Sequence, residues 1–113
     1  MHIYTSNVRT KDPDAFDITV KSGHKSFAPT WDMVNGYKSG KISESEYTEL
    51  YINMMRESWH WKNADWKKLL SRKRVVLTCY CPAEDFCHRK ILAKLLVKCG
   101  KYLKLNVQYK GEI

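Results

Sequence analysis

The sequence predicts a single α/β domain, residues 1–113, with a small and mostly parallel sheet of about four strands and helices on both faces, in a Rossmann-like arrangement. Strand-like and helix-like segments alternate along the chain, which favours parallel strands joined by helical crossovers. Residues 75–80 form an apolar, β-branched run without alternation, which is typical of a strand covered on both faces. A chain of 113 residues can bury one modest core and not two.

The first part of the chain contains two predicted strands and one predicted helix. Residues 1–6 form the first strand, and the polar residues up to Asp14 form a loop. Residues 16–21 alternate apolar and polar side chains, as in a short, half-buried strand. Pro29 marks the first turn of a helix that passes through Trp31, Val34 and Tyr37 and stops at Gly40.

The middle and the end of the chain contain two further helices and an edge strand. Ser43 and Glu46 form the capping-box pattern at the start of a helix, and apolar residues follow at helical spacing. Residues 63–70 form a short helix, and residues 103–109 form the last strand, with Leu105 and Val107 pointing inward.

Most of the reactive side chains follow the buried strand at residues 75–80. A short loop leads from this strand into a leucine-rich helix that Gly100 is expected to end. The chemistry-bearing residues of this stretch are Cys79, Tyr80, Cys81, Cys87, His88 and Arg89. Open α/β sheets bind ligands at the carboxyl ends of their strands, and the start of a helix presents unpaired N–H groups. Together with the charge of Arg89, these features predict a pocket for a phosphate or carboxylate.

Two polar residues at the end of the first strand are expected to share this pocket. Ser6 and Asn7 follow a strand that would leave the same edge of a parallel sheet. The basic cluster Lys67, Lys68, Arg72, Lys73 and Arg74 precedes the buried strand and is therefore assigned to the opposite edge.

The strand, the cysteine loop and the Cys-His-Arg sequence that opens the helix resemble the domain-of-unknown-function 488 family. The resemblance is strongest over residues 75–96, and residues 27–31 and 46–51 extend it more weakly. This resemblance implies a small α/β fold and points to Cys87, His88 and Arg89. The family has no settled activity, so it implies no reaction.

The charge of the chain narrows the class of partner. The formal net charge is +8 and the isoelectric point is near 9.4, which favours an anionic partner such as a nucleotide, a nucleic acid or a phosphorylated metabolite. A basic surface that serves only solubility is the alternative. Our leading hypothesis is a pocket for a nucleotide-like or other phosphorylated anion at the cysteine loop, and whether a reaction follows stays open.

Three alternatives remain. The first is a zinc site, for which the ligands would be Cys79, Cys81, Cys87 and His88, although their spacing is not that of a zinc ribbon. The second is a cysteine-thiolate enzyme, with Cys87 or Cys81 as a nucleophile or redox group whose thiolate is favoured by the helix start, Arg89 and the neighbouring His88. The residues 82–86 contain no glycine and two acids, which disfavours a phosphate-wrapping loop. The third is a basic nucleic-acid-binding protein without a recognisable motif.

The cellular setting is predicted from what the sequence does not contain. No segment has the apolar length of a membrane span and no signal-peptide pattern precedes the first strand, so we expect a cytoplasmic protein. In that compartment the four cysteines are expected to be reduced thiols, metal ligands or redox groups rather than a structural disulfide framework. The oligomeric state cannot be predicted.

Overall fold

A four-stranded, wholly parallel sheet forms one layer of the protein within residues 1–80 and 86–113, which are the residues that the computed structural model describes. The strand order is β2-β3-β1-β4. The bounds are His2–Asn7 for β1, Ala15–Asp17 for β2, Arg74–Cys79 for β3 and Gln108–Glu112 for β4. The predicted α/β class and parallel sheet are therefore confirmed, and β3 lies inside the sheet as its unbroken apolar run indicated.

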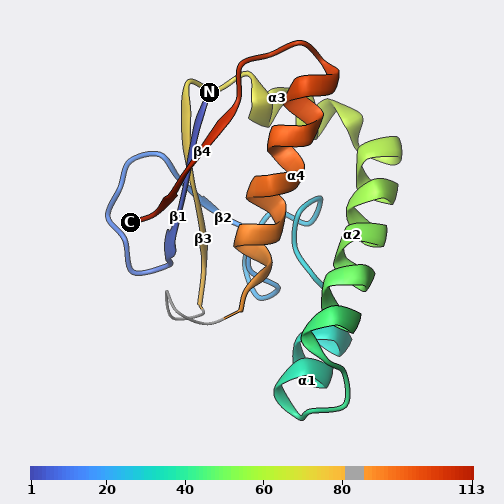
Figure 1. Cartoon of the computed structure of the whole chain (residues 1–113). Coiled ribbons are helices and arrows are strands. Elements are labelled where there is room, and N and C mark those ends of the chain that lie inside the picture. The colour runs from blue at the N-terminus through green and yellow to red at the C-terminus, as the bar shows by residue number, and fades with distance from the viewer. Residues whose placement is uncertain (81–85) are drawn as a thin grey trace.

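In the described residues, four helices accompany the sheet. They are α1 (Trp31–Lys38), α2 (Glu44–Trp61), α3 (Asn63–Leu70) and α4 (His88–Tyr102). Figure 1 shows them together on one side of the sheet, which differs from the expected cover on both faces. The physical reason is that a loop, not a helix, connects β1 to β2. None of the helices in these described ranges is long and apolar enough to cross a membrane.

The connection between β1 and β2 covers the face of the sheet that the helices leave open. Arg74 lies on this face, with its guanidinium 4.7 Å from the centre of the Tyr4 ring. The same guanidinium forms ion pairs with Asp12 at 2.7 Å and Asp14 at 3.0 Å. These contacts hold the loop against the sheet. They also show that Arg74, one residue of the basic cluster predicted at this end of β3, forms ion pairs within the protein.

The hydrophobic core lies between the sheet and the helices. Ile3 pairs with Val75 in register, and both side chains point to the helical side together with Leu77. α4 packs across β1, β3 and β4 and contributes Leu92 and Leu96 to this core. Because Cys79 lies two positions beyond Leu77, its side chain also points toward the helices. The end of β3 thus directs a sulfur atom at the start of α4.

The beginning of α2 confirms the predicted capping box. The Ser43 side chain accepts a hydrogen bond from the Glu46 backbone N–H, and the Glu46 carboxylate accepts one from the Ser43 N–H. This reciprocal pair satisfies two amide groups that the first turn leaves unpaired. The local pattern was sufficient to place this helix start because no distant part of the chain takes part in it.

Two predicted boundaries at the carboxyl end were wrong. α4 continues past Gly100 to Tyr102, and β4 begins only at Gln108. The turn between them contains Lys104 with a φ of 60°, and the Leu105 N–H donates to the Gly100 carbonyl. Leu105 is consequently 45% exposed, whereas Val107 is 8% exposed, so only Val107 points inward as predicted.

The second strand is shorter than predicted. β2 ends at Asp17, and the Asp17 carboxylate accepts a hydrogen bond of 2.8 Å from the Thr19 backbone N–H. An aspartate that bonds the backbone two residues on favours a turn over a continuing strand. Residues 18–21 therefore leave the sheet and run along its carboxyl edge, where they become part of the site described next.

Candidate functional site

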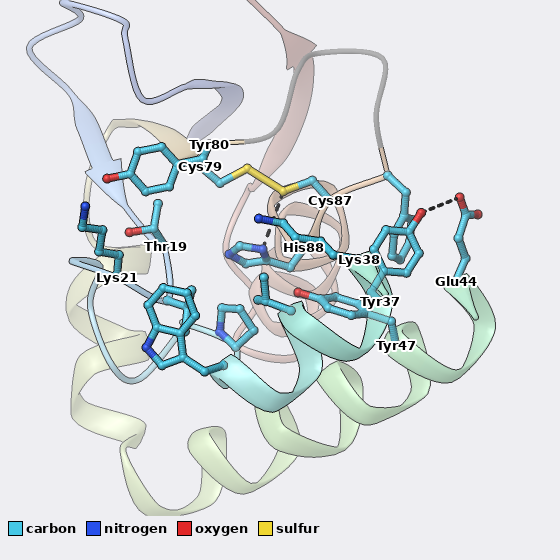
Figure 2. Close-up of a pocket in the computed structure, with 15 residues that line it drawn as sticks. Thr19, Lys21, Tyr37, Lys38, Glu44, Tyr47, Cys79, Tyr80, Cys87 and His88 are labelled. Carbon is cyan, nitrogen blue, oxygen red and sulfur yellow. Dashed lines mark hydrogen bonds between the residues drawn. A yellow bond between two sulfur atoms is a disulfide. The ribbon is translucent and has the colours of Figure 1, made fainter. Parts of the chain in front are cut away.

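A pocket of about 510 Å³ opens at the carboxyl end of β3. Its walls come from the segment after β2, from α1, from the beginning of α2 and from the residues around the start of α4, as Figure 2 shows. This is the edge at which parallel sheets bind ligands, because strand ends and helix starts leave backbone groups unpaired there. The position of the pocket agrees with the edge predicted from the cysteine loop.

A disulfide between Cys79 and Cys87 lies in the pocket wall. Cys79 is the last residue of β3 and Cys87 is the N-cap residue of α4, so this bond ties the two elements together. Both side chains are buried from bulk solvent and both line the pocket. The two sulfurs therefore face a ligand-sized space and not the open surface.

His88 lies directly behind the Cys87 sulfur. Its Nδ1 is 3.6 Å from the Cys87 Sγ, and its Nε2 is 2.6 Å from the carbonyl oxygen of Ile18. Burial lowers the pKa of His88 to about 4, so the imidazole is neutral at pH 7. A carbonyl can only accept, so Nε2 carries the proton and Nδ1 presents a lone pair to Cys87.

Arg89 supports the other sulfur from within the protein. The side chain is 0% exposed, and it forms a two-point ion pair with Glu112, with Nε to Oε1 and Nη2 to Oε2 both at 3.1 Å. Its Nη1 donates to the Cys79 Sγ at 2.7 Å. Partial burial opposes ionisation of Glu112, yet the hydrogen bonds from Arg89 hold the pKa of that carboxyl below its usual value. A fixed positive charge therefore lies against Cys79.

Aromatic rings form much of the pocket wall. Tyr37, Tyr47 and Phe86 pack against one another with ring centres 5.3–5.8 Å apart. Trp31 and Tyr80 are more open, and Trp31 is 54% exposed although it lines the pocket. This combination leaves flat apolar surfaces available to a ligand.

Three charged side chains border the same space. Lys21 comes from the segment after β2, Lys38 from the end of α1 and Glu44 from the start of α2. In Figure 2 the Lys38 side chain extends across the pocket in front of His88. Glu44 is the one acidic residue among the described residues that line the pocket. Its carboxylate accepts a hydrogen bond of 3.3 Å from the Tyr37 hydroxyl.

The predicted site residues divide into three groups. Cys79, Tyr80, Cys87 and His88 line the pocket. Ser6, Asn7 and Arg89 lie nearby without lining it. The Ser6 hydroxyl donates to the Ile113 carbonyl at 3.1 Å, the Asn7 amide donates to the Tyr80 carbonyl at 3.1 Å, and Arg89 is held as described above. Cys81 lies outside the described residues.

The pocket also contains residues of α1 that were not predicted to belong to the site. Trp31, Val34, Tyr37 and Lys38 all line the pocket, and their spacing places them along one face of the helix. That periodicity was visible in the sequence and identified the helix. It could not show that this face lies over the carboxyl edge of the sheet, because the position depends on how α1 and α2 pack together.

Three of the four predicted zinc ligands lie close together. The ligand atoms of Cys79, Cys87 and His88 are all within 4.8 Å of one another. With the two sulfurs bonded to each other, neither is a thiolate, and zinc coordination requires the deprotonated thiol. Zinc binding at this cluster therefore stays a prediction for the reduced protein.

The fold and the pocket define a small α/β protein with a ligand-sized site at the carboxyl edge of a parallel sheet and a cysteine pair in its wall. The family model DUF488-N3a, described as the active DUF488-N3 subclade, matches residues 4–100, and the chain belongs to this family. The resemblance seen in the Cys-His-Arg segment is thereby confirmed. Comparisons with curated proteins and with solved structures found no match.

Proposed function

We propose that this protein binds a planar, anionic small molecule of the nucleotide class in the pocket beside the cysteine pair. The observation that carries the proposal is the combination of aromatic walls and two lysines, Lys21 and Lys38, around a space of about 510 Å³. Pockets for small molecules and cofactors have volumes of roughly 300–1,000 Å³ and place a few polar groups among apolar walls.

The aromatic side chains fit the flat part of such a ligand. Every nucleobase has a π-face, so stacking on Trp31 or Tyr80 would hold a base whatever its pattern of hydrogen-bond donors and acceptors. Both rings are exposed and line the pocket, whereas Tyr47 is buried and supports the wall. We assign the stacking role to Trp31 and Tyr80 for this reason.

The cationic groups fit the phosphate. Lys21 and Lys38 supply charge, and the start of α4, at Cys87 and His88, lines the same pocket. Cys87, the N-cap residue, makes no side-chain capping hydrogen bond to the first turn of that helix, so a ligand oxygen would not compete with one. The net charge of +8 further favours an anion. In this proposal Arg89 supports the site through Cys79, and the lysines contact the phosphate.

The experiment is a thermal-shift screen with mononucleotides, dinucleotides and inorganic phosphate. Binding to the folded state raises the melting temperature. Trp31→Ala is expected to weaken nucleotide binding by about tenfold or more, since stacking contributes about 1–3 kcal/mol per base. Lys38→Ala is expected to weaken it severalfold, and less at high salt because solvent ions screen exposed charges.

Matched controls separate the pocket from the general surface. Trp61 is 73% exposed and does not line the pocket, and Lys25 is an exposed lysine away from it. Trp61→Ala and Lys25→Ala should therefore leave nucleotide binding unchanged. Equal losses in the pocket variants and the controls, or no stabilisation by any nucleotide, would contradict the proposal.

The same samples distinguish a nucleotide pocket from a nucleic-acid surface. A pocket saturates with a mononucleotide or dinucleotide, whereas binding to long polymers weakens steeply with salt as condensed counterions are released. Tight binding that needs an oligonucleotide and disappears at moderate salt would favour the nucleic-acid alternative instead.

A further inference from the structure

The two sulfurs of the Cys79–Cys87 pair have different electrostatic surroundings. The guanidinium of Arg89 donates to the Cys79 sulfur at 2.7 Å and is fixed there by Glu112. The Cys87 sulfur faces the unprotonated Nδ1 of His88 at 3.6 Å. A permanent positive charge stabilises a thiolate, whereas a neutral acceptor favours the protonated thiol. We therefore expect the Cys79 thiol to have a lower pKa than the Cys87 thiol in the reduced pair.

We propose that Cys79 and Cys87 carry out thiol–disulfide exchange with a small thiol or disulfide that enters the pocket, with Cys87 as the sulfur attacked and Cys79 as the leaving thiolate. The position of the pair supports this role, since both cysteines line a space large enough for such a substrate. Exchange is faster when the departing thiol has a low pKa, and Arg89 provides that condition at Cys79.

The first step begins from the disulfide. A substrate thiolate attacks the Cys87 Sγ, and a bond forms between these two sulfurs while the Cys87–Cys79 bond breaks. The electron pair of the broken bond stays on the Cys79 Sγ, which becomes a thiolate that accepts the N–H of Arg89. The product is a mixed disulfide between the substrate and Cys87.

The second step completes the transfer of two electrons. Another substrate thiolate attacks the substrate sulfur of the mixed disulfide, forms a substrate disulfide and expels Cys87 as a thiolate. Cys87 takes up a proton from water, and its S–H can then donate to Nδ1 of His88. Two thiols have been oxidised to one disulfide and the protein disulfide has been reduced; a substrate disulfide reacts by the same steps in reverse.

The first test measures access to the pair in the folded protein. A Cys81→Ser/Cys99→Ser background leaves only Cys79 and Cys87 as sources of thiol. The protein is treated with dithiothreitol under native conditions, the reductant is removed, and the thiols are counted before and after. We expect none before reduction and two after it. Thiols that appear only in denaturant, or two thiols before any reduction that glutathione disulfide cannot oxidise, would overturn the proposal.

The second test measures which of the two sulfurs is attacked and which thiol ionises at the lower pH. The oxidised protein is exposed briefly to glutathione, quenched with acid, and the adduct is located by fragment-ion mass spectrometry. We expect at least ten times more glutathione on Cys87 than on Cys79. In single variants, iodoacetamide should alkylate Cys79 in Cys87→Ser with a midpoint pH below the ordinary thiol value of about 8.5. Cys87 in Cys79→Ser should have a midpoint at or above that value.

An adduct mainly on Cys79, or the same alkylation midpoint for both cysteines, would contradict the assigned roles. The alkylation profile also separates an effect of Arg89 on the sulfur from a merely structural one, since packing alone does not lower the pH midpoint. Neither test uses a nucleotide. Failure of nucleotide binding would therefore leave this inference standing, and failure of the exchange would leave the binding proposal standing.

Discussion

His88 shows how burial fixes the chemistry of one side chain. Burial is the largest cause of its low pKa; the hydrogen bond to Ile18 partly opposes it, the positive charge of Arg89 adds to it and the negative charge of Asp17 opposes it. The imidazole is neutral in the folded protein, whereas in the unfolded chain it has the ordinary histidine pKa of 6.5. The tautomer that faces Cys87 thus follows from the fold and not from the sequence order of Cys87 and His88.

We expect a pH dependence of stability from this residue. Between pH 6.5 and about 4 the unfolded chain binds a proton at His88 that the folded protein does not, so the free energy of unfolding falls as the pH falls through this window. The total effect is about 3 kcal/mol, from about 1.4 kcal/mol for each unit of pKa difference. Below about pH 4 this contribution stays constant.

Urea unfolding at several values of pH between 7 and 5 measures the effect before most carboxylates titrate. His88→Gln removes the ionisable ring and should show a much flatter dependence over the same range. If the variant and the original protein lose stability equally as the pH falls, His88 is not the buried neutral group described here.

Arg89 and Glu112 form a partly buried ion pair that is expected to contribute to stability. Glu112→Gln removes the carboxylate that accepts two hydrogen bonds from the buried guanidinium of Arg89. A hydrogen bond to a charged group contributes about 1.5–3 kcal/mol, so we expect the free energy of unfolding to fall by about 2 kcal/mol. Glu49→Gln, at an exposed position of α2, is the matched control and should change stability little. An equally small effect of both substitutions in urea unfolding would show that the Arg89 pair is unimportant.

The sequence could predict where Arg89 lies in the chain's fold but not which residue it contacts. The Cys-His-Arg sequence at a helix start identified the position of the site. It could not show that Glu112, 23 residues later, returns beside Arg89 and accepts two hydrogen bonds from its guanidinium. The interpretation of Arg89 as an anion ligand rested on the helix start alone and stays a prediction, whereas the contact with Glu112 depends on the fold.

At the scale of elements, the contact between α4 and the segment before β4 depends on one glycine. A Cβ atom added at Gly100 would overlap the side chain of Val107, approaching its Cβ to 2.8 Å. The sequence identified Gly100 as a helix terminator, whereas the structure uses the absence of a side chain for close packing inside the helix. A pattern of residue types cannot distinguish these two uses of glycine.

Gly100→Ala is therefore expected to destabilise the protein by about 1–3 kcal/mol, which is the usual cost of overpacking a tight contact. Gly36→Ala in α1 is the matched control. A Cβ atom added at Gly36 would meet the Ile42 side chain at 3.4 Å, which is an ordinary van der Waals distance. The control should be neutral or stabilise by up to about 1 kcal/mol, since alanine favours a helix more than glycine. Chemical unfolding of both variants measures the contrast, and a stabilising Gly100→Ala would show that the contact is loose.

For the molecule as a whole, the sequence could predict the α/β class but not the order of the strands or the position of α1 at the pocket. The unbroken apolar run of β3 and the helical periodicities identified strands, helices and a parallel sheet. The strand order places β3 between β1 and β2, and this order is set by contacts between segments far apart in the chain. The same is true of the pocket, whose aromatic wall includes residues of α1, a helix that packs on α2.

Isothermal titration calorimetry can show whether this pocket binds a nucleotide-like anion. Nucleotides that stabilise the protein would be titrated into the original chain, into Trp31→Ala and into Trp61→Ala. We expect one nucleotide bound per chain, about tenfold or more weaker binding for Trp31→Ala, and unchanged binding for Trp61→Ala. Absence of saturable heat with every nucleotide, or equal affinity in all three proteins, would contradict the assignment of the site.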